Sequence, residues 1–278
     1  MDFWFTETVH DVVGTSIKVK ERIFSGRSEY QKIEIIDTYQ FGRILILEGS
    51  VQLTEKDEFT YHEMISHVPL FTHSNPERVL VIGGGDGGTI REVMKHPTVT
   101  RAELVEIDSL VIEKSKQFLP FVSCEMENPR VEVIIRDGIE YVKAHRGAFD
   151  VILIDSTDPV GPAVGLYQKE FFEDIYKALK DDGIMVIQSE SPFFDQDIVR
   201  ELYATLKPLF PIRKMYLAPV PSYPSGSWSF AFCSKKYDPI SDNRCEDLRR
   251  LNLHMRYYNE TIHRAAFAIP NFVQELIA

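Results

Sequence analysis

The sequence predicts an α/β protein in which a doubly wound, mainly parallel sheet follows a small N-terminal antiparallel β domain. Three observations lead to this fold class. Strands and helices alternate over residues 78–207, as in parallel sheets with helices on both faces. A glycine-rich loop stands between the first of these strands and its helix. Residues 1–57 instead contain short β-branched runs separated by turns, which are typical of hairpins.

The N-terminal domain, residues 1–57, is expected to be a small antiparallel sheet. Its runs alternate in polarity or are β-branched, and turn residues such as Ser25-Gly26 and Glu48-Gly49 separate them. The predicted strands are Gly14–Phe24, Tyr30–Asp37, Gly42–Leu47 and Val51–Thr54. A sheet of this size is marginally stable alone, so we expect it to pack on the main domain or on a partner subunit.

The main domain, residues 58–278, is expected to begin with a helix over Glu58–Phe71. The predicted central strands are Val79–Ile82, Ala102–Ile107, Val131–Ile135, Phe149–Ile154 and Ile184–Gln188. The helices predicted between and after them are Thr89–Lys95, Ser109–Phe118, Ile139–His145, Lys169–Leu179 and Asp195–Lys207. Lys214–Ala218 and Trp228–Cys233 predict an antiparallel pair at the border of the sheet, and the tail from Cys245 is mainly helical.

The stretch Arg78–Thr89, R-V-L-V-I-G-G-G-D-G-G-T, carries the most specific local signal. An apolar run leads into Gly83-x-Gly85-x-x-Gly88, which is the Rossmann-like fingerprint in its strand–turn–helix context. Glycines let the backbone turn sharply and approach a ligand closely. Asp86 is unusual in such a loop because a carboxylate repels a pyrophosphate. The loop therefore indicates a nucleoside ligand that carries positive charge.

Composition narrows the classes of partner. The chain has 278 residues, is 44% hydrophobic and has a formal net charge of -11, which argues against nucleic acid and anionic membrane as partners. The three cysteines show no metal-binding spacing, which predicts reduced thiols and no zinc. The N-terminus lacks the pattern of a signal peptide, and no apolar run approaches membrane-spanning length. We therefore expect a cytoplasmic protein.

Acidic residues follow each of the first four central strands. Asp86 lies in the glycine loop, and Glu106 ends the second strand 23 positions beyond Gly83. Asp137 follows the third strand, and Asp155 and Asp158 follow the fourth. A single acid at such a position is usually a helix cap or solvated surface. Because ligands of open α/β sheets bind at this edge, several acids there indicate a cationic ligand or a metal ion.

The metal interpretation is the weaker one, since no calcium-loop spacing is present. Glu106 is placed to accept hydrogen bonds from ribose hydroxyls, and Asp137-Gly138 would lie near a base. With Asp86 beside a cation, these residues describe an S-adenosyl sulfonium ligand. Asp86 would oppose the carboxylate of S-adenosylmethionine, so it favours a ligand whose tail ends in an ammonium group.

Motifs along nearly the whole chain resemble those of the spermidine synthase family of polyamine aminopropyltransferases. The matching stretches are S-E-Y-Q (28–31), V-Q-L-T-E-K-D-E-F-T-Y-H-E-M (51–64), V-I-G-G-G-D-G-G (81–88), V-E-I-D (105–108), R-D-G (136–138), D-S-T-D-P-V-G-P (155–162) and P-S-Y-P-S-G-S-W-S-F (221–230). Together they are highly specific. The resemblance implies a class I methyltransferase-like catalytic domain that transfers the 3-aminopropyl group of decarboxylated S-adenosylmethionine to putrescine. The products would be spermidine and 5′-methylthioadenosine.

The resemblance also implies roles for individual residues. The donor would be bound by Gln31, Gly83, Gly85, Asp86, Glu106, Asp137, Gly138, Asp155 and Pro162. The acceptor amine would be bound by Gln52, Tyr61, His62, Asp86, Asp155, Asp158 and Tyr223. Asp155 would accept the proton of the attacking amine, assisted by Tyr61. No permanently bound cofactor and no metal is expected, and the assembly would be a homodimer or homotetramer.

Several alternatives stay open at this level. A methyltransferase on the same fold would use S-adenosylmethionine itself. Asp86 argues against this alternative, because its carboxylate would oppose the carboxylate of that donor. A non-catalytic nucleotide-binding protein would not need the Asp155/Asp158 pair. The acceptor could be putrescine, cadaverine, agmatine or spermidine. Val160–Leu166, rich in small residues, is expected to form either a lid or a plain surface loop.

Overall fold

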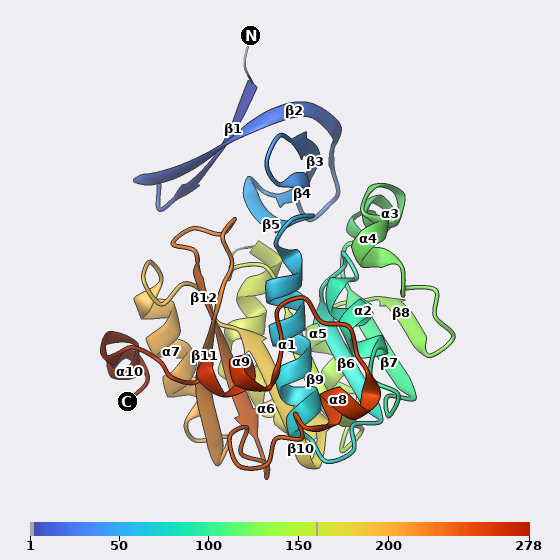
Figure 1. The fold of residues 1–278 in the computed structure, drawn as a ribbon, viewed down its shortest axis with the longest axis vertical. Coiled ribbons are helices and arrows are strands. Elements are labelled where there is room, and N and C mark those ends of the chain that lie inside the picture. Colours follow the sequence, from blue (N-terminus) through green and yellow to red (C-terminus); the bar gives the residue numbers. More distant parts are fainter. Residues whose placement is uncertain (1–2, 160) are drawn as a thin grey trace.

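The computed structural model describes residues 3–159 and 161–278. Its N-terminal part is a five-stranded antiparallel sheet. Its strands follow chain order: β1 (Phe3–Val9), β2 (Val13–Arg27), β3 (Lys32–Thr38), β4 (Gly42–Leu47) and β5 (Ser50–Thr54). The sheet lies at one end of the elongated molecule (Figure 1). Strand β1 was not predicted, β2 extends further at both ends than predicted, and β3 begins two residues later at Lys32.

The main sheet has seven strands in the order β11-β12-β10-β9-β6-β7-β8. The parallel strands are β6 (Arg78–Gly83), β7 (Arg101–Glu106), β8 (Val131–Ile135), β9 (Phe149–Asp155) and β10 (Leu179–Gln188). The remaining two are β11 (Ile212–Pro219) and β12 (Ser227–Ser234), and β12 runs antiparallel to both its neighbours. This order confirms the predicted doubly wound, methyltransferase-like fold. The crossovers change direction between β6 and β9, where such sheets bind ligands.

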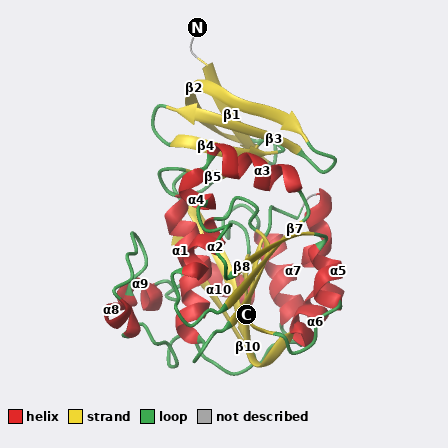
Figure 2. Cartoon of the chain, turned by 90° about the vertical axis from the view of Figure 1, so that its right-hand side faces the viewer, coloured by secondary structure: helices red, strands yellow, loops and turns green. Residues whose placement is uncertain are grey.

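Helices cover both faces of this sheet (Figures 1 and 2). The helices of the described residues are α1 (Glu58–Thr72), α2 (Gly88–Met94), α3 (Ser109–Phe118), α4 (Pro120–Ser123), α5 (Gly138–Lys143), α6 (Lys169–Ala178), α7 (Gln196–Leu206), α8 (Asp247–Leu251), α9 (Glu260–Ala265) and α10 (Asn271–Ile277), with the 3₁₀ helix η1 (Gly161–Tyr167). The apolar run of β6 explains the two layers, because Val79 and Val81 face one buried cluster while Leu80 and Ile82 face the other.

The N-terminal sheet packs on the main domain, as expected. Ile33, Leu45 and Leu53 join Val111 of α3 and Leu119 beside α4 in one buried cluster. Figure 2 shows α3 and α4 directly against the sheet. Within the described ranges, no helix is both long and apolar enough to cross a membrane. In the predicted lid segment, Val160 lies outside the described residues. The rest of the segment, from Gly161 to Leu166, belongs to η1.

Candidate active site

The glycine loop brings the ends of β6 and β9 together. Gly83 pairs with Asp155 in the sheet, and the Gly84 N–H donates to the Asp155 carbonyl over 2.7 Å. Gly83 has φ +77°, and a Cβ there would overlap that carbonyl oxygen. A Cβ on Gly85 would lie 2.8 Å from Glu106 Oε2. The glycines therefore allow the loop to lie directly against two of the predicted acidic residues, Asp155 and Glu106.

Asp155 is held by two hydroxyl groups. The Tyr61 hydroxyl donates to Oδ1 over 2.7 Å, and Thr89 Oγ1 donates to Oδ2 over 2.6 Å. Burial raises the pKa of the Asp155 carboxyl, and the nearby carboxylate of Asp86 raises it further. The two hydroxyl bonds fix the carboxylate in one orientation. A higher pKa makes it a better proton acceptor than an exposed aspartate.

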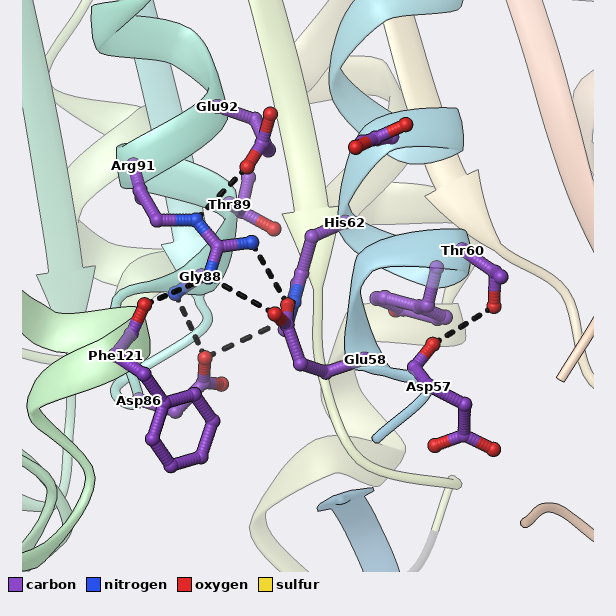
Figure 3. Close-up of polar contacts among 12 residues, drawn as sticks. Asp57, Glu58, Thr60, His62, Asp86, Gly88, Thr89, Arg91, Glu92 and Phe121 are labelled. Atoms are coloured by element: carbon purple, nitrogen blue, oxygen red, sulfur yellow. Dashed lines mark hydrogen bonds and ion pairs between the residues drawn. The ribbon is translucent and has the colours of Figure 1, made fainter. Parts of the chain in front are cut away.

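His62 and Asp86 face each other (Figure 3), and each has a side-chain atom within 4.8 Å of one of Asp155. Asp86 Oδ1 accepts the Gly88 N–H over 2.7 Å and lies 3.4 Å from His62 Nε2. His62 Nδ1 lies 2.6 Å from Glu58 Oε2. Burial alone would lower the pKa of His62, but the carboxylates of Asp86 and Glu58 outweigh it and raise this pKa to about 9. His62 is therefore a cation at neutral pH.

Of the residues predicted for the adenosyl part of the donor, Glu106 and Asp137 lie at two neighbouring strand ends, and Gln31 comes from the N-terminal domain. Burial raises the pKa of Glu106 to about 7, and its Oε1 accepts the Asp108 N–H over 2.8 Å. The Gln31 side chain, from the N-terminal domain, donates to Asp108 Oδ2 over 3.0 Å and does not bond Glu106 directly. Asp137 caps α5 by accepting the Ile139 N–H over 2.8 Å.

The other two residues predicted at this part of the site are Gly138 and Pro162. Gly138 is buried against Ile82, where a Cβ would overlap the isoleucine side chain. Pro162 belongs to η1, but its side chain lies outside the described residues.

Two of the residues predicted for the acceptor amine, Tyr61 and Tyr223, form an aromatic wall together with Trp228. The rings of Tyr61 and Tyr223 lie 6.0 Å apart, and Trp228 packs on the edge of Tyr223 at 4.8 Å. The Tyr223 hydroxyl donates to the backbone carbonyl of Gln52, whose side chain bonds the Ser50 carbonyl over 3.2 Å. The hydroxyl groups of Tyr61 and Tyr223 therefore both have hydrogen-bond partners. These bonds hold the two rings of the wall in place beside Asp155.

Two acids near Asp158 were not predicted from the sequence. Glu190 hydrogen-bonds Asp158, and burial, together with the Asp158 carboxylate, raises the pKa of Glu190 well above its usual value. Glu7 of β1 is 8% exposed, its Oε2 has no hydrogen-bond partner, and burial raises its pKa to about 7. Asp158 acts electrostatically on Glu7 as well. These three residues, here called the distal acids, come from β1 and from the ends of β9 and β10.

For the two distal acids that were not predicted, Glu190 and Glu7, the sequence contained one usable signal. Glu190 follows the fifth central strand, so the rule that singled out acids after the first four strands would have found it. Glu7 could not be placed, because its strand was not predicted. The role of Thr89 could not be predicted either, because a residue that directly follows a glycine loop is expected to belong to the first turn of a helix.

A divalent ion would suit some of the same groups. His62, Asp86 and Asp155 each place one possible ligand atom within 4.8 Å of the others. Both oxygens of Asp155 already accept hydroxyl groups, and the His62 ring points both nitrogens at carboxylates. A second group, His73, Asp150 and Asp182, includes a carboxylate that already pairs with Lys180 at 2.8 Å. An organic ammonium fits the first group better than a metal, because it needs acceptors and no lone pair from His62.

Family models and curated relatives match nearly the whole chain. The model of the spermine/spermidine synthase domain matches residues 58–243, and that of the spermidine synthase tetramerisation domain matches residues 3–55. The polyamine aminopropyltransferase of Caldicellulosiruptor saccharolyticus is 51% identical over 277 residues, which cover 100% of this chain and 99% of that protein. That of Bacillus subtilis is 48% identical over 276 residues, with 99% of each covered.

Two solved structures are similar in both fold and sequence. A spermidine synthase in complex with the transition-state analogue AdoDATO superposes with a TM-score of 0.97 at 45% identity, covering 99% of this chain and 94% of that one. The spermidine synthase of Thermotoga maritima gives a TM-score of 0.96 at the same identity and coverage. The family predicted from the motifs is thereby confirmed: the chain belongs to the spermidine synthase family and is a polyamine aminopropyltransferase.

Proposed function

We propose that this enzyme transfers the 3-aminopropyl group of decarboxylated S-adenosylmethionine to putrescine, giving spermidine and 5′-methylthioadenosine. The observation that carries the proposal is the place of Asp86, inside the glycine loop and next to Asp155. Two carboxylates at this point suit a donor tail that ends in an ammonium group. A methyltransferase would have to accept a carboxylate there, which Asp86 opposes.

The donor would lie along the ends of β6, β7 and β8. Glu106 would accept the ribose hydroxyls, with Gln31 held nearby through Asp108. Asp137 and Gly138 would lie at the base, and the family pattern also assigns Pro162 to the methylthioadenosine part of the donor. Gly83 and Gly85 would allow the close approach of the adenosyl group. The donor is a co-substrate, so no resident cofactor is required.

The chemical step is a direct in-line displacement. The lone pair of the acceptor nitrogen forms a bond to the carbon beside the sulfonium sulfur. The carbon–sulfur bond breaks, and its electrons leave with sulfur as a neutral thioether. An alkylammonium has a pKa of about 10.4, so the acceptor arrives protonated and must lose a proton before it attacks. Asp155 would take that proton, held in place by Tyr61 and Thr89.

The distal acids would hold the second ammonium group of the acceptor. Glu7, Asp158 and Glu190 are buried or half-buried, and burial raises the pKa of each. A bound ammonium would stabilise their ionised forms and give the orphaned Oε2 of Glu7 a partner. The site would then select a diamine by its second charge, with Tyr223 lining the path between the two ends.

Glu7→Gln is expected to raise the KM for putrescine about tenfold, since a charge-assisted hydrogen bond is lost, and to leave the donor KM unchanged. Because the pKa of Glu7 is raised to about 7, its carboxylate attracts the acceptor only above that pH. Acceptor binding by the unmodified enzyme should therefore weaken as pH falls through about 7, and this component should be absent from Glu7→Gln.

Steady-state kinetics from pH 6 to 9 measure both effects. Glu48→Gln is the matched control, because Glu48 is an acid of the same domain. Its side chain is 51% exposed and pairs with Arg27. Equal losses of donor and acceptor affinity in Glu7→Gln would mean that the strand, and not the acceptor site, had been disturbed.

The choice of putrescine is tested by competition. In an equimolar mixture of putrescine, cadaverine, agmatine and spermidine, supplied with a donor whose aminopropyl group carries a heavy isotope, we expect labelled spermidine to be the main product, identified by mass. Prior treatment with EDTA should not change the rate. A dominant product from another acceptor would replace putrescine in the proposal, and loss of rate with EDTA would favour a metal at Asp86 and Asp155.

We also propose that the chain forms a homodimer or homotetramer through its N-terminal sheet. Phe3 and Trp4 of β1 are 46% and 53% exposed, which is unusual for large apolar side chains. The matched tetramerisation-domain model covers the same strands. Light scattering should give two or four times the mass of the chain, and the mass of a monomer at micromolar concentration would contradict the proposal.

The three cysteines support the predicted cytoplasmic location. All are free thiols, and Cys233 and Cys245 are buried. Reduced buried thiols are typical of proteins that work in a reducing compartment.

A further inference from the structure

A buried chain of alternating charges runs from the interior to the donor side of the site (Figure 3). Its members, in spatial order, are Glu92, Arg91, Glu58, His62 and Asp86. Arg91 Nε lies 2.8 Å from Glu92, and its two terminal nitrogens donate to the two oxygens of Glu58 over 2.9 and 2.8 Å. Glu58 then bonds His62, and His62 faces Asp86. The side chains of Glu58 and His62 are 4% and 3% exposed, so water scarcely screens the chain.

His62 has almost no freedom to move within this chain. A Cβ on Gly88 would overlap its ring, which shows how closely the ring packs on the loop backbone. Tyr61 meets the other side edge-on at 5.4 Å. With one ring nitrogen 2.6 Å from Glu58 Oε2 and the other 3.4 Å from Asp86 Oδ1, both nitrogens face carboxylates, an arrangement that favours the imidazolium form. His62 in this state has no lone pair for an incoming amine.

We propose that Glu58 and Arg91 are positioning residues for aminopropyl transfer: Arg91 fixes Glu58, Glu58 holds His62 against the glycine loop as a cation, and His62 in turn orients Asp86 toward the ammonium group of the donor. The inference rests on the proposed function, since it assumes that Asp86 binds that ammonium. It assigns a task to two buried charges that do not contact either substrate in the proposed arrangement. It also changes the role of His62 from lining the acceptor channel to supporting the donor site.

The charge of His62 depends on its partners. Burial disfavours its protonation, while Glu58, Asp86 and Asp155 favour it. Arg91 is the nearby cation and is bonded to Glu58, and the Tyr61 hydroxyl is committed to Asp155. Removing the charge of Glu58 leaves His62 buried beside Arg91 with one close carboxylate fewer. The imidazole should then lose its proton near neutral pH, and Asp86 should lose its partner.

Glu58→Gln is therefore expected to lower kcat/KM for the donor about tenfold at pH 8, the effect of one charge-assisted hydrogen bond, with a smaller loss at pH 6. The KM for putrescine should not change. His62→Gln keeps a donor group toward Asp86 but cannot titrate, so it should flatten the pH profile. The double variant should behave like His62→Gln alone, because Glu58 acts through His62.

Glu63→Gln is the control. Glu63 lies on the same helix, is 1% exposed and accepts the backbone N–H groups of Arg256, Tyr257 and Tyr258. Its replacement should lower thermal stability without moving the pH profile. Arg91→Lys keeps the charge but not the paired bonds to Glu58, so its loss should be smaller than that of Glu58→Gln.

The protonation state of His62 can also be measured directly, in the unmodified enzyme and without catalytic turnover. The ring nitrogens of His62 in the ¹⁵N-labelled enzyme should report the imidazolium form up to about pH 9. A neutral ring at pH 7, or additive losses in the double variant, would overturn the inference. If the unmodified enzyme transfers no aminopropyl group, the proposed function fails instead, while the NMR result still decides the state of His62.

Discussion

Asp155→Asn is expected to lower kcat about a thousandfold, in the range that a general base contributes, while methylthioadenosine still binds. Asparagine keeps the shape of the side chain and can still accept a hydroxyl from Tyr61 or Thr89. It cannot take the proton of the attacking amine. The change therefore separates proton transfer from the placement of the ligands.

Single-turnover rates and calorimetric titration with methylthioadenosine measure the two quantities. Asp182→Asn is a suitable control, since Asp182 bonds Tyr237 and lies near His73, away from the residues of the site. Because burial raises the pKa of Asp155, the unmodified enzyme should lose rate as pH falls toward that pKa. A turnover within tenfold of the unmodified enzyme would mean that another group, or water, accepts the proton.

Asp86→Asn is expected to weaken binding of decarboxylated S-adenosylmethionine about a hundredfold, as the loss of one partner from a buried charge pair commonly does. Binding of S-adenosylmethionine should weaken less or improve, because the carboxylate that opposes its own carboxylate is gone. The preference between the two donors is thus the sharpest measure of what Asp86 does.

Equilibrium titration of both donors gives this preference directly, with Asp182→Asn again as control. The Gly88 N–H should still find an acceptor on the asparagine oxygen, so the loop should keep its shape. Equal losses for both donors would show that Asp86 shapes the loop and does not choose the donor.

The central fold was predictable because its signals are local. Helix α3 and strand β8 begin and end at the predicted residues, and the buried apolar run before the glycine loop is strand β6. Strand β1 was missed because most of Phe3–Val9 is exposed, so the run lacks an alternation between buried apolar and solvated polar positions. Missing β1 also hid Glu7.

The contacts among charged groups were less predictable. Glu58 and His62 stand four residues apart on one helix, a spacing that predicts their contact. Arg91 comes from another helix, 33 residues later, and only the packing of α1 on α2 brings it to Glu58. The same holds for Tyr61 and Asp155, which are 94 residues apart. Sequence reasoning could name these residues as acids, bases or donors, but the fold decides which of them pair.

The most direct measurement supplies the purified enzyme with putrescine and either decarboxylated S-adenosylmethionine or S-adenosylmethionine, and quantifies all products by mass. We expect spermidine and methylthioadenosine in equal amounts from the decarboxylated donor, and no transfer from S-adenosylmethionine. Methylated product, or no spermidine with the decarboxylated donor, would contradict the assignment of Asp86 and Asp155 as an ammonium site.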